Sequence, residues 1–353
     1  MTAENTLTIN GTLVSFAPGE TILQTAERHS IWIPTLCRLK RASPTGACRV
    51  CIVEIDGQSS PVRSCSTPTE AGMVVRTETS AIRAARRRTL IRLLSSGYHE
   101  CLLCPASGDC RLQDMAYRYG AMGSHTSAPK TDFDFEDVNP FIVRDFSRCI
   151  MCGRCVKACR EIQANDAIDF NRPQQPDRII TPGDRSLKDS DCVFCGECLQ
   201  ACPTGALVHR NAPPEPRGWE TRTVKSTCTF CGVGCQIRLH VRDDSVCRVT
   251  GAEDSPPSYG SLCSKGRFGF GFIHSPERLT SPLVKERGGF RQASWQEALD
   301  LVSARLSAIK AESGPDSIGV FTSARITNEE NYLIQKFARA GLGTNNVDHC
   351  ARL

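Results

Sequence analysis

The chain has 353 residues, of which 40% are hydrophobic and 23% charged, and its 43 basic and 38 acidic residues give a net charge of +5. This length predicts two or three globular domains, and so mild a charge argues against nucleic-acid binding. No apolar run approaches the roughly 18 residues of a membrane span and the first ten residues lack a signal-peptide core, so we expect a cytoplasmic protein rather than a membrane-integral or secreted one.

Cysteine is the outlier of this composition, with 21 residues. In a chain that is not exported, so many thiols predict metal ligands rather than disulfides. The cysteines form five groups along the sequence, and only Cys247 and Cys350 belong to none of them.

The amino-terminal residues predict a small domain rich in strands. Strands are expected at 7–9 and 13–16, joined by an Asn10-Gly11 turn, and are followed by a helix over 21–29 and a strand over 50–55. The cysteines here have the spacing C-x10-C-x2-C-x13-C and form the 2Fe set: Cys37, Cys48, Cys51 and Cys65. Together these features resemble a [2Fe–2S] ferredoxin of the β-grasp fold, in the form found at the amino terminus of the large iron–sulfur subunit of respiratory complex I and of iron hydrogenases. A zinc site is the alternative.

A basic helix is predicted next, over residues 81–94, with five arginines that we expect to form a solvated face rather than a docking patch. The cysteines after it have the spacing C-x2-C-x5-C. In the complex I and hydrogenase families a histidine-ligated [4Fe–4S] cluster occurs here, with its histidine at the position that is Gly97 in this chain. This sequence departs from that spacing, and its nearest histidine implies the His–Cys set: His99, Cys101, Cys104 and Cys110. A different fourth ligand or a three-iron cluster is the alternative.

Two further groups share the spacing C-x2-C-x2-C-x3-C, and Pro203 follows the last cysteine. In this spacing three thiolates hold three irons of one cubane, and the fourth cysteine binds the neighbouring cluster. The first cubane set is therefore Cys149, Cys152, Cys155 and Cys202, and the second cubane set is Cys159, Cys192, Cys195 and Cys198. Residues 139–211 thus resemble a two-cluster bacterial ferredoxin. Zinc knuckles and disulfides are the alternatives.

The fifth group has the spacing C-x2-C-x3-C-x27-C and forms the pterin-side set: Cys228, Cys231, Cys235 and Cys263. Its surroundings, TCTFCGVGC and GSLCSKGR, resemble the opening of molybdenum or tungsten bis-pterin oxidoreductases, in which a [4Fe–4S] cluster lies beside a pterin guanine dinucleotide. The resemblance implies that Lys265 contacts this pterin. The alternative is an exposed lysine in a loop.

The remaining residues resemble one family of bis-pterin oxidoreductases in particular. The stretch FGFGFIHSPERLT at 268–280 is similar to formate dehydrogenases. A helix with Ser294 as its N-cap, a buried strand at 320–323 and a second helix from 329 to about 341 are predicted after it. The whole chain therefore resembles the amino-terminal part of the catalytic subunit of a cytosolic NAD-linked formate dehydrogenase.

The last residues resemble the approach to the metal ligand of that family. There a cysteine or selenocysteine follows at once after the stretch that matches residues 349–353. We therefore expect the catalytic ligand just after Leu353, as a selenocysteine whose UGA codon is read as a stop, and a chain that is inactive alone. We expect Cys350 to pack beside this ligand rather than to bind the metal.

The predicted fold class is α+β, modular and multidomain. We expect a β-grasp [2Fe–2S] domain at 1–79, a small helical cluster domain at 80–123, a two-cluster ferredoxin at 139–211, a bis-pterin cluster domain at 219–285 and the beginning of an α/β domain at 286–353. Linkers are expected at 124–139 and 210–218. Elements after 285 should lack the layers that would cover them.

The resemblance implies an oxidoreductase that converts formate to carbon dioxide at molybdenum or tungsten. Electrons would pass through one [2Fe–2S] and four [4Fe–4S] clusters to a flavin subunit that reduces NAD(P), and a further small iron–sulfur subunit is a candidate partner. The alternative is an electron-transfer subunit of a hydrogenase or complex-I-like enzyme with no catalytic site of its own. The sequence leaves open the metal, the direction of catalysis, and whether NAD, NADP or ferredoxin is the acceptor.

Overall fold

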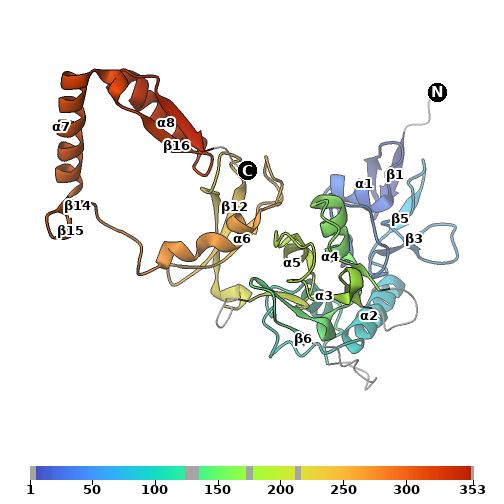
Figure 1. The fold of residues 1–353 in the computed structure, drawn as a ribbon. Coiled ribbons are helices and arrows are strands. Elements are labelled where there is room, and N and C mark those ends of the chain that lie inside the picture. Colours follow the sequence, from blue (N-terminus) through green and yellow to red (C-terminus); the bar gives the residue numbers. More distant parts are fainter. Residues whose placement is uncertain (1–4, 124–134, 172–177, 211–215, 351–353) are drawn as a thin grey trace. The chain divides into compact units, whose positions relative to one another are not determined.

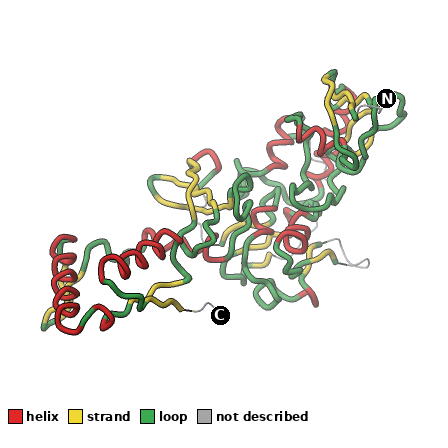
Figure 2. The backbone as a smooth tube through the Cα atoms, turned by 90° about the horizontal axis from the view of Figure 1, so that it is seen from above, coloured by secondary structure: helices red, strands yellow, loops and turns green. Residues whose placement is uncertain are grey.

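The computed structural model describes residues 5–123, 135–171, 178–210 and 216–350. The chain divides into two compact units, Met1–Arg222 and Thr223–Leu353 (Figure 1). This division falls close to the domain start predicted at residue 219, and the other domain boundaries stay predictions. Most of the cysteines lie in the loops, which are green in Figure 2. Within the described residues, no helix is both long and apolar enough to cross a membrane.

A five-stranded sheet opens the first unit, in the order β2-β1-β5-β3-β4. Its strands are β1 (Thr6–Ile9), β2 (Thr12–Ser15), β3 (Ile52–Ile55), β4 (Val62–Arg63) and β5 (Val74–Arg76). β1 pairs antiparallel with β2 and parallel with β5, whereas β3 pairs antiparallel with β5 and β4. The strand predicted over 50–55 is shorter than expected, because Val50 and Cys51 belong to the cysteine-bearing loop before it.

The predicted hairpin and helix of this region are both present. Asn10 and Gly11 have φ angles of 51° and 85°, the left-handed values that a two-residue hairpin turn needs. Helix α1 (Ile22–Arg28) begins after Thr21, which forms a capping box with Gln24. One side of α1 packs on the sheet, and this core consists of Leu7, Ile9, Val14, Ile22, Leu23, Ala26, Ile33, Cys51, Val53, Ile55, Cys65 and Val75.

Two helices follow the sheet, α2 (Ser80–Ser95) and α3 (Arg111–Arg118). α2 is the predicted basic helix, and its buried residues recur at every fourth position: Ile82, Arg86, Leu90 and Leu94. The prediction of a solvated arginine face is therefore wrong for Arg86, whose side chain is 0% exposed. Its position in the apolar stripe, one turn from Ile82 and one from Leu90, turns it inward with them.

The region of the two cubane sets consists of short elements joined by long loops. A three-stranded sheet has the order β10-β7-β6, formed by β6 (Phe135–Glu136), β7 (Ile142–Asp145) and β10 (Leu207–His209). A two-stranded pair is formed by β8 (Asp169–Phe170) and β9 (Ile179–Ile180). The helical segments are α4 (Arg154–Lys157), α5 (Glu197–Ala201), η1 (Phe146–Arg148), η2 (Ala158–Ile162), η3 (Pro182–Asp184) and η4 (Gly218–Glu220).

The two predicted linkers lie partly outside the described residues, at 124–134 and 211–215. Their described ends are packed parts of the fold, which corrects the prediction there. Asn139 is fully buried, and its Oδ1 accepts hydrogen bonds from the backbone N–H groups of Phe141 and Ile142, at the start of β7. Arg217 donates to the carbonyl oxygen of Leu102 at 3.0 Å. The linkers were predicted because the first stretch is polar and Asp-rich and the second is rich in proline, but Asn139 and Arg217 are hydrogen-bonded into the fold.

The second unit begins with a three-stranded sheet in the order β11-β12-β13. Its elements are β11 (Arg222–Thr227), β12 (Gln236–Arg242) and β13 (Ser245–Gly251), followed by α6 (Ser264–Phe268) and η5 (Gly269–His274). The elements beyond are β14 (Leu283–Glu286), β15 (Gly289–Gln292), α7 (Trp295–Ser313), η6 (Pro315–Ser317), β16 (Val320–Ser323), α8 (Asn328–Lys336), η7 (Phe337–Leu342) and β17 (Val347–Cys350). β14 and β15 form a hairpin, and β16 pairs parallel with β17.

The elements after residue 285 are helices and strands as predicted, but few of their side chains are buried against other elements. Ser294 caps α7, accepting a hydrogen bond from the N–H of Glu297 at 3.1 Å. However, α7 buries none of its residues, and Phe321 in the strand predicted as buried is 86% exposed. This agrees with the expectation that these elements lack covering layers.

Candidate iron–sulfur sites

All 21 cysteines are free thiols, so the alternative of structural disulfides finds no support. In residues 5–123, 135–171, 178–210 and 216–350, no group of three or more His, Cys, Asp or Glu side chains is arranged to hold a single metal ion. The predicted ligands nevertheless lie near one another, and those of the 2Fe set are all buried.

The 2Fe set lies on the loops between α1 and β3 and just after β4, and all four of its thiols are buried. The thiols hydrogen-bond in two pairs, Cys37 with Cys48 and Cys51 with Cys65. The bond from Cys48 lowers the pKa of Cys37 to about 5, and the bond from Cys65 lowers the pKa of Cys51 to about 7. The same bonds, together with burial, raise the pKa values of Cys48 and Cys65, so one thiol of each pair ionises more readily than its partner.

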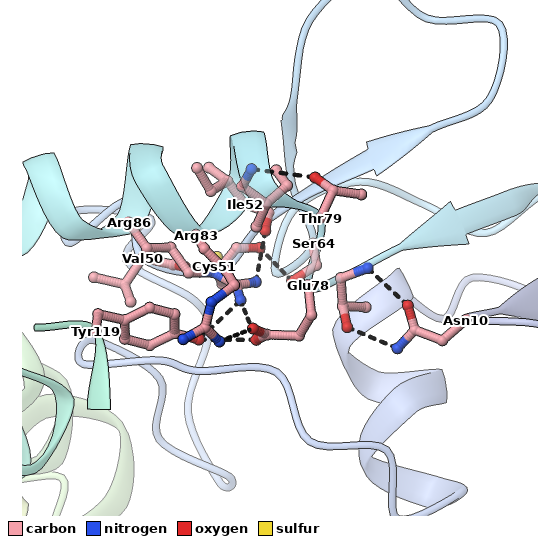
Figure 3. A network of polar contacts seen from close by, with 12 residues as sticks. Asn10, Val50, Cys51, Ile52, Ser64, Glu78, Thr79, Arg83, Arg86 and Tyr119 are labelled. Carbon is pink, nitrogen blue, oxygen red and sulfur yellow. Dashed lines mark hydrogen bonds and ion pairs between the residues drawn. The ribbon is translucent and has the colours of Figure 1, made fainter.

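Arg86 contacts the backbone of the loop that carries Cys51, as Figure 3 shows. Its guanidinium donates to the carbonyl oxygens of Val50 at 3.0 Å and Ile52 at 2.8 Å, on either side of Cys51. It also pairs with Glu78 at 2.6 Å. The sequence analysis missed this role. The apolar residues of α2 recur every four positions, and Arg86 falls in that series, which could have indicated that it is buried.

The His–Cys set lines one cavity, which is also lined by Leu94, Ser107, Leu112, Gln113, Arg148, Thr204 and Gly205. Burial raises the pKa of Cys110 to about 12, and burial together with neighbouring charges raises the pKa of Cys101. The Nε2 atom of His99 is buried. The structure therefore brings His99 to the same cavity as the three cysteines.

Gly97 offers a physical reason for the displaced histidine. A Cβ atom at Gly97 would lie 2.1 Å from the backbone oxygen of Ser147, so no side chain fits at the usual ligand position. The same point lies 3.5 Å from Nε2 of His99. The imidazole of His99, two residues later in the chain, therefore lies beside the position that a side chain at residue 97 would take.

The first cubane set lines a second cavity, whose other lining is mostly apolar: Phe146, Ile150, Ile168, Ile179, Leu187, Pro203, Ala206 and Leu207, with Arg144, Gly153, Cys198 and Thr204. Cys202 is thereby beside the three cysteines of the preceding group, as the crossed pattern predicts. In the second cubane set, Cys192 lies close enough to Cys195 and Cys159 for their charges to raise its pKa. Each fourth cysteine therefore lies with the other group.

The loops that carry the two sets have the same backbone conformation. Met151 and Phe194 occupy equivalent positions with φ angles of 51° and 53°, and each precedes, by two residues, a glycine with φ of 73°. Their N–H groups each lie 3.4 Å from a sulfur, that of Cys149 and that of Cys192. Burial raises the pKa of both thiols to about 11, and these N–H groups oppose that rise by stabilising the thiolates.

A single apolar core joins three of the sets. It contains Leu36, Cys37, Cys48, Val50, Leu90, Leu94, Cys110, Leu112, Ala116, Tyr119, Ala121, Ile150 and Cys152. The hydroxyl of Thr45, in the loop of the 2Fe set, donates to the carbonyl oxygen of Cys152 at 3.0 Å. The thiol of Cys110 donates to the carbonyl oxygen of Pro203 at 3.5 Å. The 2Fe, His–Cys and first cubane sets are therefore packed against one another without solvent between these residues.

The pterin-side set lies in the second unit, where the turn between β11 and β12 meets the start of α6. Cys228 is buried, its N–H donates to the carbonyl oxygen of Cys235 at 2.8 Å, and the other three cysteines are near enough to raise its pKa together with burial. A Cβ at Gly266 would lie 3.5 Å from the Cys228 sulfur, so the first turn of α6 packs closely on this site. Cys263 and Lys265 are exposed. Cys247, on β13, belongs to no set.

Five family models match successive parts of this chain. They are the 2Fe-2S iron-sulfur cluster binding domain at residues 2–80, the NADH-ubiquinone oxidoreductase-G iron-sulfur binding region at 86–125, the 4Fe-4S dicluster domain at 148–206, the Molybdopterin oxidoreductase Fe4S4 domain at 221–275 and the Molybdopterin oxidoreductase at 278–353. Together with the buried ligand sets, they define an oxidoreductase subunit with [2Fe–2S], [4Fe–4S] and molybdopterin regions.

The chain is also similar to individual proteins of known name. The chain is 39% identical to the NADPH-Fe(3+) oxidoreductase subunit alpha of Geobacter sulfurreducens, over 98% of this chain and 40% of that protein. It is 35% identical to a Bacillus subtilis protein named "Putative formate dehydrogenase YrhE", over 98% of this chain and 39% of that protein. In structure it matches a chain of an NAD+-reducing [NiFe]-hydrogenase with a TM-score of 0.56 and 30% identity, over 60% of this chain and 89% of that one.

The chain therefore has the domains of an NADH-G-like molybdopterin oxidoreductase subunit. It spans about 40% of the length of the curated relatives it matches.

Proposed function

We propose that this chain is the iron–sulfur electron-transfer part of a formate dehydrogenase catalytic subunit. It carries electrons from a molybdenum- or tungsten-bis-pterin centre that oxidises formate to a flavin-containing partner that reduces NAD(P). The observation that supports this most is the shared apolar core, which packs cysteines of three ligand sets together in one unit whose chain continues into molybdopterin oxidoreductase regions.

In this proposal the five sets hold one [2Fe–2S] and four [4Fe–4S] clusters. When bound, the metal–pterin centre supplies the two-electron oxidation of formate, and the clusters supply one-electron carriers. The residues of this chain bury the thiols of the 2Fe set, and N–H groups such as those of Met151 and Phe194 stabilise the ionised form of thiols in the cubane sets. Lys265, two residues after Cys263 and exposed on α6, would contact the pterin.

The complete subunit, purified anaerobically from its native host with the partners that accompany it, provides the test. Iron analysis should give about 18 irons per chain. Addition of formate should bleach the visible absorption of the clusters and produce the EPR signals of reduced [2Fe–2S] and [4Fe–4S] centres. Clusters that stay oxidised with formate, but are reduced by hydrogen or by NADPH, would contradict the assignment to formate dehydrogenase.

The His99 assignment has its own test in the same material. A His99→Ala variant should alter one [4Fe–4S] EPR signal and leave the others unchanged. The matched control is His29→Ala, because His29 lies outside the ligand sets, is only half-buried, and is bonded to the backbone oxygen of Ser15 at 2.8 Å. An unaltered spectrum in His99→Ala would point to another fourth ligand.

A second candidate function rests on the 39% identity to the Geobacter protein. In that case the same clusters carry electrons that enter from NADPH and leave to an acceptor such as ferric iron. The formate experiment separates the two, since this candidate expects cluster reduction by NADPH and none by formate.

A further inference from the structure

Arg148 lies between two of the cluster sites and has no part in the ligand assignments. It is the last residue of η1 and precedes Cys149, the first cysteine of the first cubane set. Its side chain is 12% exposed and lines the cavity of the His–Cys set. Within that cavity its guanidinium hydrogen-bonds to the thiol of Cys104.

The surrounding groups fix Arg148 in this position. Its Nε donates to Oδ2 of Asp145 at 2.6 Å, and its backbone oxygen accepts a hydrogen bond from the hydroxyl of Thr204 at 2.9 Å. Gly205 leaves room beside it, since a Cβ there would lie 3.6 Å from Cδ of Arg148 and only 2.5 Å from the sulfur of Cys104. One end of the guanidinium is thus anchored to a carboxylate, and the side chain passes along the Cys104 side of the cavity.

The other end of the guanidinium, at Nη1, can donate further hydrogen bonds. Nη1 of Arg148 is buried and has no acceptor among the described residues. A buried donor without an acceptor costs free energy, which is recovered if an anionic group fills the adjacent cavity. An iron–sulfur cluster with thiolate ligands is such a group, and it becomes more negative by one charge when it is reduced.

An arginine stays protonated at all working pH values, so its charge is permanent. Because the Arg148 side chain is mostly buried, this charge interacts with a neighbouring cluster more strongly than it would in water. It stabilises the reduced cluster more than the oxidised one, since the reduced cluster carries the extra electron. Asp145 offsets part of this effect.

We propose that Arg148 raises the reduction potential of the [4Fe–4S] cluster bound by the His–Cys set, and so makes that cluster the favoured acceptor for electrons arriving from the neighbouring first cubane set. The inference rests on the proposed function, because it requires a cluster in the His–Cys cavity. Arg148 does not bind iron. It acts on the cluster through its positive charge.

The test is a redox titration of the complete subunit followed by EPR, in the wild type and in Arg148→Gln and Arg148→Lys variants. The signal of the His–Cys cluster is identified by its loss in Cys104→Ser. At the wild-type midpoint potential, the ratio of reduced to oxidised cluster should fall about tenfold in Arg148→Gln, which corresponds to about 59 mV for a one-electron couple. Arg148→Lys keeps the charge and should shift much less.

The matched control is Arg160→Gln, since Arg160 is also paired with carboxylates, those of Asp166 and Asp169, but its side chain is 44% exposed. An unchanged potential in Arg148→Gln, or an equal shift in Arg160→Gln, overturns the inference. Loss of the cluster in both Arg148 variants would assign a structural role and overturn it as well. If Cys104→Ser removes no [4Fe–4S] signal, the ligand assignment of the proposed function fails first, and the inference fails with it.

Discussion

The buried arginine of α2 leads to a prediction about stability and about the [2Fe–2S] site together. Arg86→Met removes a guanidinium whose side chain is 0% exposed and keeps much of its hydrocarbon volume. The matched change is Arg83→Met on the same helix, because Arg83 pairs with the same carboxylate, Glu78, at 2.9 Å (Figure 3). The two variants therefore remove one ion pair each to a common partner and differ in burial.

The magnitude follows from the contacts that are lost. Arg86 donates to the oxygens of Val50, Ile52 and Tyr119 at 3.0, 2.8 and 2.9 Å, and at about 1 kcal/mol for each hydrogen bond these amount to about 3 kcal/mol. The pair with Glu78, whose side chain is 32% exposed, adds about 1 kcal/mol, which brings the total to about 4 kcal/mol. Arg83 is 51% exposed, so its loss should cost less than about 1 kcal/mol.

A urea titration followed by the visible circular dichroism of the [2Fe–2S] cluster measures this difference. With a slope of about 2 kcal/mol per molar urea, Arg86→Met should lower the midpoint by about 2 M and Arg83→Met by less than about 0.5 M. Arg86→Met should also retain less [2Fe–2S] iron at rest, since the carbonyls beside Cys51 lose their anchor. Equal midpoints for the two variants would refute the reasoning from burial.

Three further predictions concern the other sites. Cys202→Ala should abolish one [4Fe–4S] EPR signal, whereas Cys247→Ala, outside every set, should leave the iron content unchanged; equal iron in both would contradict the crossed ligand pattern. Gly205→Ala should lower occupancy of the His–Cys cluster because its Cβ would lie 2.5 Å from a cysteine sulfur, while Gly271→Ala, with no atom within 4 Å, should have no effect on iron content. Hydrogen bonding to the neighbouring arginine lowers the pKa of Glu20 to about 2 from 4.5, so its carboxylate stabilises the fold fully above pH 4.5 and loses that contribution as the pH falls through about 2. The difference in urea midpoint between the wild type and Glu20→Gln should therefore be constant from pH 7 to 5 and shrink below pH 4.5.

Short stretches of sequence predicted most of the elements and the grouping of the candidate ligands. The hairpin at Asn10 and Gly11, the N-cap at Ser294 and the grouping of the cysteines are all local patterns, set by residues a few positions apart. Local geometry decides them, because a two-residue turn or a three-cysteine loop is specified within its own stretch of chain. For that reason they could be predicted without knowing the fold.

Only the tertiary structure decided which polar residues are inside. The sequence showed one arginine run, whereas the fold buries Arg86 against loop carbonyls and leaves Arg83 half exposed. The position of Arg148 beside Cys104, 44 residues earlier in the chain, depends on how η1 packs against a separate loop. The same packing excludes a side chain at Gly97, where Ser147 approaches, and brings His99 to the cavity instead. These outcomes follow from contacts between residues far apart in sequence, and the free energy of burying a charge depends on partners that only the folded chain supplies.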